Sequence, residues 1–217
     1  MKLIKVERAK AIWLFQTSEL NPRGLDLVPM VSAVKNRYKF FGHPKTPEEL
    51  FGNAQKFDNG AFTIQDGRSI GVQALTFFSD GIVAETQHST DATDDFLADL
   101  MSFSVKSFGV EFADSMVLEK RYLSELTVKS DCDLDAVSDK FLRFSQVLTG
   151  LDPLRSSYSA SGMHFSTDPE IPSSTMQFRF ERRVTSRASE RQFFTQAPLS
   201  TANHIKAFEA LESIFSS

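Results

Sequence analysis

Five arginines close together in the last quarter of the sequence have the strongest potential for binding chemistry: Arg179, Arg182, Arg183, Arg187 and Arg191. Apolar and polar residues alternate from 175 to 184, which predicts a strand with one buried face. Guanidinium groups bind phosphates and carboxylates in bidentate geometry. The candidate contacts to an anion or partner are therefore Arg179, Arg183, Arg187 and Arg191. A solvated face that Glu181 and Glu190 partly neutralise is the alternative explanation.

The four histidines do not form a local metal site. His43, His88, His164 and His204 are far apart in the sequence, and none forms an H-x-x-x-H or H-x-H pair. We expect His88 and His204 at the surface beside helix starts. An enzyme would need a cleft that brings His88, His164 or His204 against a carboxylate.

No other motif predicts catalysis or cofactor binding. The acidic segment 131–135 has Ala136 where a calcium loop needs Gly and Leu142 where it needs Glu, so we interpret its aspartates as helix-capping residues. The sequence lacks G-x-S-x-G, G-x-G-x-x-G and the phosphate-binding loop motif. The single cysteine, Cys132, excludes an internal disulfide. We predict no catalytic residue, cofactor or metal.

Hydrophobic periodicity predicts the elements that carry these residues. Strands are expected at 10–17, 56–64, 69–79, 82–87, 116–128, 158–166, 175–184 and 191–196, and helices at 26–37, near 47, from 89 or 90 to 108, 134–148 and 201–215. Asp80 and Gly81 are expected to be the central residues of a hairpin turn.

The order of these elements predicts an α+β fold, with a largely antiparallel sheet and amphipathic helices on one face. Three strands and a helix occur twice in succession, which suggests two similar meander-plus-helix halves. The segment 151–161 is rich in Ser, Pro and Asp. It marks the expected boundary between residues 1–150 and residues 151–217, although both parts can belong to one domain.

Composition limits the partners. The 217-residue chain is 41% hydrophobic and carries a net charge of −4, which gives no general attraction to nucleic acid or anionic membranes. Phenylalanine is abundant, with 21 residues against 4 of Tyr and Trp together, and this favours a Phe-packed core. Without a visible signal peptide or apolar span, we expect a cytoplasmic protein with no membrane contact.

These observations favour a non-catalytic protein-interaction or assembly subunit. We expect it to associate with itself, as a dimer, and with another protein. Two alternatives remain: an anion- or nucleic-acid-binding module that uses the arginine-rich strand, and an enzyme whose site is assembled from distant residues.

Overall fold

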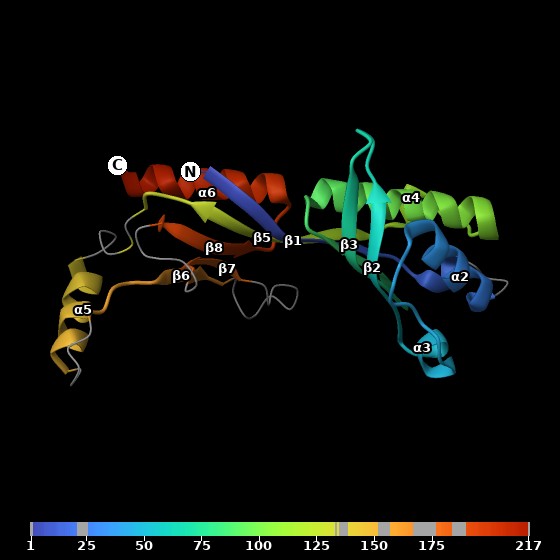
Figure 1. Ribbon diagram of the computed structural model, residues 1–217, viewed down its shortest axis with the longest axis horizontal. Coiled ribbons are helices and arrows are strands. Elements are labelled where there is room, and N and C mark those ends of the chain that lie inside the picture. The colour runs from blue at the N-terminus through green and yellow to red at the C-terminus, as the bar shows by residue number, and fades with distance from the viewer. Residues whose placement is uncertain are drawn as a thin grey trace. The chain divides into compact units, whose positions relative to one another are not determined.

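The structure is a computed structural model that describes residues 2–20, 26–132, 134, 139–151, 157–166, 177–183 and 190–216. These residues form six helices and an eight-stranded antiparallel sheet, which confirms the predicted α+β class (Figure 1). The strands are β1 (Lys2–Leu14), β2 (Ala54–Thr63), β3 (Ser69–Phe78), β4 (Gly81–Thr86), β5 (Glu119–Lys129), β6 (Gly162–Phe165), β7 (Phe178–Arg182) and β8 (Gln192–Ala197). The helices are α1 (Thr17–Leu20), α2 (Leu27–Tyr38), α3 (Pro47–Phe51), α4 (Thr90–Phe108), α5 (Asp139–Leu151) and α6 (Thr201–Ser216).

The strand order is mirrored about the middle of the sheet. The strands follow the order β2-β3-β4-β1-β5-β8-β7-β6. In the sequence, β2, β3 and β4 precede α4, and β6, β7 and β8 precede α6. The structure thus contains the two meander-plus-helix halves that the element order predicts.

By its contacts, the chain divides into two compact units. Unit 1 contains Met1–Lys5, Glu125–Pro198 and Ala202–Ser217, and unit 2 contains Val6–Ser124 and Leu199–Thr201. The expected boundary near residues 150–160, between one domain or two similar parts, stays a prediction.

In unit 2, helices α2 and α4 share one apolar core with the sheet (Figure 1). Ala9, Ala11 and Trp13 are buried at alternate positions of β1, as the two-residue period of a strand requires. Ser89 caps α4 by accepting a hydrogen bond from the Ala92 amide, and Gly109 ends the helix in a left-handed conformation. Both helix ends agree with the sequence prediction.

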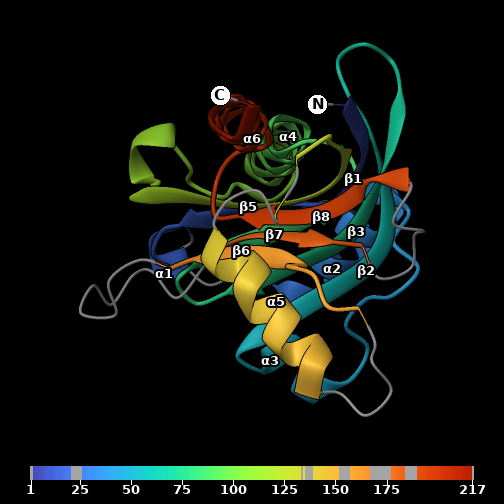
Figure 2. The same cartoon turned by 90° about the vertical axis from the view of Figure 1, so that its left-hand side faces the viewer.

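In unit 1, helix α6 lies along β8, whereas α5 stands apart from the strands (Figures 1 and 2). The Phe180 ring of β7 stacks on Phe193 of β8 at 4.5 Å and lies 4.9 Å from Phe208 of α6. These rings form the Phe-rich core that the composition favours.

The expected turn is displaced by one residue. Phe78 pairs with Gly81, so the central residues of the β3–β4 hairpin are Ser79 and Asp80. The prediction of Asp80 and Gly81 is wrong because Gly81 already belongs to β4, where it pairs with Leu14 of β1. The hairpin itself is confirmed.

Candidate functional site

The structure gives three of the four candidate arginines different surroundings. Arg179 on β7 is exposed and lies opposite His164 of β6 in the strand pairing. Arg183 donates a hydrogen bond to the buried Thr127 hydroxyl at 2.6 Å. Arg191 forms an ion pair of 2.7 Å with Asp131. Arg187 lies outside the described residues, so the proposed cluster stays a prediction.

The acidic segment 131–135 supplies one of these contacts. Asp131 is the ion-pair partner of Arg191, while residues 133 and 135 lie outside the described part of the chain. The capping role of this segment therefore stays a prediction. In the described residues, no group of three or more His, Cys, Asp or Glu side chains is arranged to hold a metal ion.

One histidine approaches a carboxylate. His164 Nε2 lies 3.1 Å from Glu181 Oε1, and both side chains are largely exposed on β6 and β7. Neither of the two cavities described below includes this pair. A pair on an open strand surface lacks the enclosed cleft that a site built from distant residues requires.

His204 does not lie at the surface as expected. It is fully buried on the inner face of α6, and its Nε2 atom lies 2.9 Å from the Thr195 hydroxyl. Burial lowers the pKa of its imidazole to about 4. The ring is therefore neutral at pH 7 and packs within the core of unit 1.

Helix α5 leaves its apolar side chains exposed. The exposed fractions are 52% for Phe141, 61% for Phe144 and 76% for Leu151, and Leu142 and Val147 are about half exposed. Ser145 is the buried residue among the described side chains of this helix. Ser145 borders the apolar stripe, four residues after Phe141 and three before Leu148, so α5 buries one small residue and leaves most of its large apolar side chains in water. The sequence predicts this apolar face but gives no indication that it is left uncovered.

A second feature that the sequence does not predict is a cavity of about 470 Å³ in unit 2. Its buried walls include Phe15, Ile82, Met101 and Ser104, and its exposed rim includes Asn53. Among the described residues, none that lines the cavity is charged. The lining comes from α1, α2, β2, β3, β4, α4 and the segments next to them, so no local motif could reveal it.

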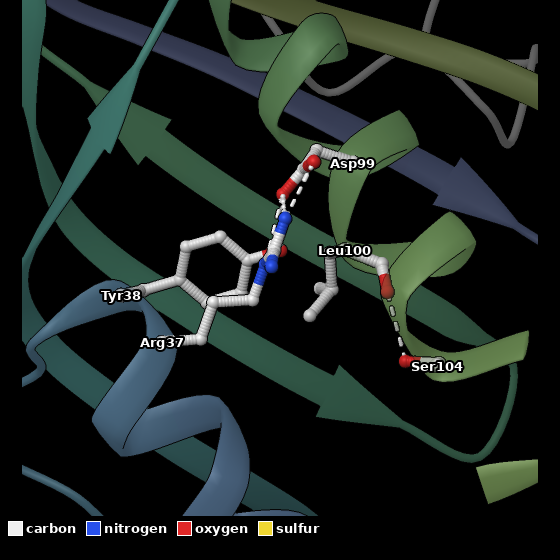
Figure 3. A network of polar contacts seen from close by, with 5 residues as sticks. All are labelled: Arg37, Tyr38, Asp99, Leu100 and Ser104. Carbon is white, nitrogen blue, oxygen red and sulfur yellow. Dashed lines mark hydrogen bonds and ion pairs between the residues drawn. The ribbon is translucent and has the colours of Figure 1, made fainter. Parts of the chain in front are cut away.

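One wall of this cavity belongs to α4, which a polar network joins to α2 (Figure 3). Arg37 and Tyr38 both point toward Asp99, and the shortest contacts are 2.9 Å from Arg37 Nη2 and 2.7 Å from the Tyr38 hydroxyl. Burial raises the pKa of Tyr38, and the Asp99 hydrogen bond raises it further. Tyr38 therefore stays protonated and continues to donate to Asp99.

The same network borders a smaller hollow of about 270 Å³, lined by Arg37, Tyr38, Lys39, Phe62 and Asp99 among others. The Arg37 guanidinium also lies 4.7 Å from the centre of the Phe103 ring. The Arg37 guanidinium is thus already paired with Asp99 and packed on an aromatic ring. The network therefore holds α2 against α4, and Arg37 is not available to bind an anion.

In comparisons with known proteins, no protein-family model and no curated protein matches this chain. No helix in the described ranges is long and apolar enough to cross a bilayer.

Proposed function

We propose that this protein is a non-catalytic assembly subunit that pairs with a second copy of itself through helix α5. The observation that carries the proposal is the exposed apolar face of this helix. Removing several large apolar side chains from water is the main favourable term in protein association.

The spacing of these side chains favours an identical partner. Phe141, Phe144, Leu148 and Leu151 follow one another at intervals of three, four and three residues, which is the seam of a helix pair. This series reads the same in both directions. In an antiparallel pair, Phe141 faces Leu151 of the second copy and Phe144 faces Leu148. The seam is therefore its own complement, as a two-fold interface requires.

The helix is long enough for such a contact. Its 13 residues extend about 20 Å at the usual rise per residue. Phe144 lies near the middle of the helix, where a side chain is most fully enclosed by a partner. We therefore expect Phe144 to contribute most to the interface.

The test is the mass of the protein in solution, measured by light scattering during size-exclusion chromatography. A single chain has a mass of 24.3 kDa. We expect the native protein to have twice this mass, and Phe144→Asp to return it to the single-chain mass because a carboxylate would be buried without a counter-charge. Gln146→Asp places the same charge on the exposed polar side of α5 and is the matched control.

Two results would contradict the proposal. A native protein with the single-chain mass throughout the micromolar range would exclude stable self-association. A Phe144→Asp variant that keeps the doubled mass would exclude α5 as the interface. Circular dichroism of each variant checks that the fold is retained.

Binding of an anionic partner through Arg179 is the second candidate. Arg179 is exposed next to His164, and the described residues place no carboxylate within ion-pair distance of its guanidinium. We expect Arg179→Glu to reduce binding to a single-stranded oligonucleotide and to reduce its salt dependence, because each phosphate contact adds to the salt slope. Absence of oligonucleotide binding by the native protein would eliminate this candidate.

A further inference from the structure

The cavity in unit 2 has the size and the lining of a small-molecule site. Its volume of about 470 Å³ lies within the range of roughly 300–1,000 Å³ that is common for ligand pockets. At the roughly 30 Å³ that a water molecule occupies in the liquid, it has space for about 15 such volumes. A molecule of two fused aromatic rings fits within this space.

The uncharged character of the described lining restricts the chemistry of the ligand. Among the residues that the structure describes, each one that lines the cavity is apolar or carries an uncharged polar group. An ionised group placed against these walls would lose its hydration and gain no counter-charge. The buried part of the ligand must therefore be uncharged and mostly apolar.

Ser104 adds one directional requirement. Its side chain is buried in the cavity wall, and its Oγ atom donates to the Leu100 carbonyl oxygen at 2.9 Å (Figure 3). A serine hydroxyl has one hydrogen and two lone pairs. Since the hydrogen is already used, Ser104 can only accept a hydrogen bond from a molecule in the cavity.

We propose that this cavity binds an uncharged apolar molecule that carries a hydrogen-bond donor, such as an aromatic alcohol, and that Ser104 accepts from this donor. The proposal concerns unit 2 and is independent of the pairing through α5.

Two probes of equal size separate the contributions of shape and donor. 1-Naphthol carries a hydroxyl donor where 1-methylnaphthalene carries a methyl group. We expect both to bind the native protein in isothermal titration calorimetry. Ser104→Ala should weaken 1-naphthol roughly three- to ten-fold, the value of one hydrogen bond, and leave 1-methylnaphthalene unchanged.

A filled cavity tests the location. Leu27 of α2 lines the cavity and is only partly buried, so Leu27→Trp should occupy the space and abolish binding of both probes. Leu118→Trp makes the same change at a position that is 74% exposed and does not line the cavity, and it should bind both probes as the native protein does. Thermal melting confirms that each variant is folded.

The possible failures have distinct meanings. If neither probe binds the native protein, or if folded Leu27→Trp binds both as well as the native protein does, the cavity is not the site. If Ser104→Ala weakens both probes equally or neither of them, Ser104 does not select for a donor. The mass in solution is measured separately, so failure here leaves the assembly proposal untouched.

Discussion

Gly81 occupies a position where a side chain has no space. Its φ angle is +152°, and a Cβ atom would collide with the Trp13 carbonyl oxygen and lie 3.1 Å from the Leu14 Cα atom. The contact arises because β1 and β4 pair through Leu14 and Gly81. The sequence indicates the need for glycine near this turn, but the neighbouring strand that enforces it is distant in sequence.

We expect Gly81→Ala to lower the free energy of unfolding by about 1–3 kcal/mol, because it adds both backbone strain and a steric clash. Gly71→Ala in β3 is the matched control, since a Cβ atom there meets nothing within 4 Å. Urea denaturation measures both changes. Equal effects of the two substitutions would show that the close approach to Trp13 does not constrain Gly81.

His204 is a polar residue at an apolar position. It precedes Phe208 by four residues and so shares the buried face of α6, a spacing that places it in the core and not at the surface as predicted from the neighbouring helix start. The Thr195 hydroxyl donates to the Arg179 carbonyl oxygen at 2.9 Å. Its only hydrogen is then used, so the contact with His204 is one in which the imidazole Nε2–H donates.

This burial predicts a loss of stability in acid. The pKa of His204 is about 4 in the folded protein, against an ordinary value of 6.5, so the unfolded chain binds the proton more readily. Neutral His204 contributes about 3 kcal/mol to the free energy of unfolding. This contribution is fully present above pH 6.5 and is lost as the pH falls from 6.5 to 4. Below pH 4 this group causes no further change.

The variant His204→Gln retains an amide donor but cannot titrate. We expect the free energy of unfolding to depend less on pH between 4 and 6.5 in this variant than in the native protein. If His204→Gln has the native pH profile, other groups cause the acid response.

At the scale of elements, Asp94 connects α4 to two strands through hydrogen bonds. Its carboxylate accepts hydrogen bonds of 2.7 Å from Trp13 Nε1 of β1 and 2.7 Å from the Tyr122 hydroxyl of β5. The sequence suggests only that Asp94 favours the positive end of the helix dipole. The two contacts depend on strands far away in the chain, so they could not be predicted from local pattern.

We expect Asp94→Ala to destabilise the protein by about 1–3 kcal/mol, since it leaves the buried Trp13 N–H without an acceptor. Asp95→Ala removes the neighbouring, exposed carboxylate and should cost only a few tenths of a kcal/mol. Chemical denaturation with tryptophan fluorescence follows both. A similar cost for the two variants would mean that the contacts to β1 and β5 add nothing to the charge effect.

Local signals predict some element ends correctly and miss others. The helix start at 26, the start at 89 or 90 and the end at 108 are correct, because the caps Asp26, Ser89 and Gly109 depend on neighbouring residues. The start of β1 is missed because its exposed residues, including Lys2 and Lys5, hide the alternation. The helix expected at 134–148 ends later than predicted, since α5 continues through Gly150 to Leu151.

For the whole molecule, the element order allowed the two meander-plus-helix halves to be predicted, and the structure adds a contact within unit 2 between the first residues of α4 and α6. The Thr90 amide donates to the Thr201 hydroxyl at 3.0 Å, and the Thr201 amide donates to the Thr90 hydroxyl at 2.9 Å. Each threonine is the first residue of its helix, α4 or α6. These two reciprocal hydrogen bonds give one backbone amide at the start of each helix an acceptor. They form only when α4 and α6 are both folded.

We expect Thr201→Val to destabilise the protein by about 1–3 kcal/mol, because the buried Thr90 amide loses its acceptor. Thr201→Ser retains the hydroxyl and should remain close to the native stability. Amide hydrogen exchange at Thr90 reports the local effect, and exchange at the native rate in Thr201→Val would contradict the assignment.

The division of the chain between the units has a consequence for its synthesis. The segment Val6–Ser124 forms nearly all of unit 2 and leaves the ribosome before the rest of unit 1 exists. The first strand residues, up to Lys5, belong to unit 1 and must wait for residues beyond Glu125. A waiting strand end is a site for wrong pairing in a nascent chain, and lysines on such an end oppose it. We expect Lys2 and Lys5, both exposed in the finished sheet, to oppose wrong pairing at the stage when β1 is only partly paired.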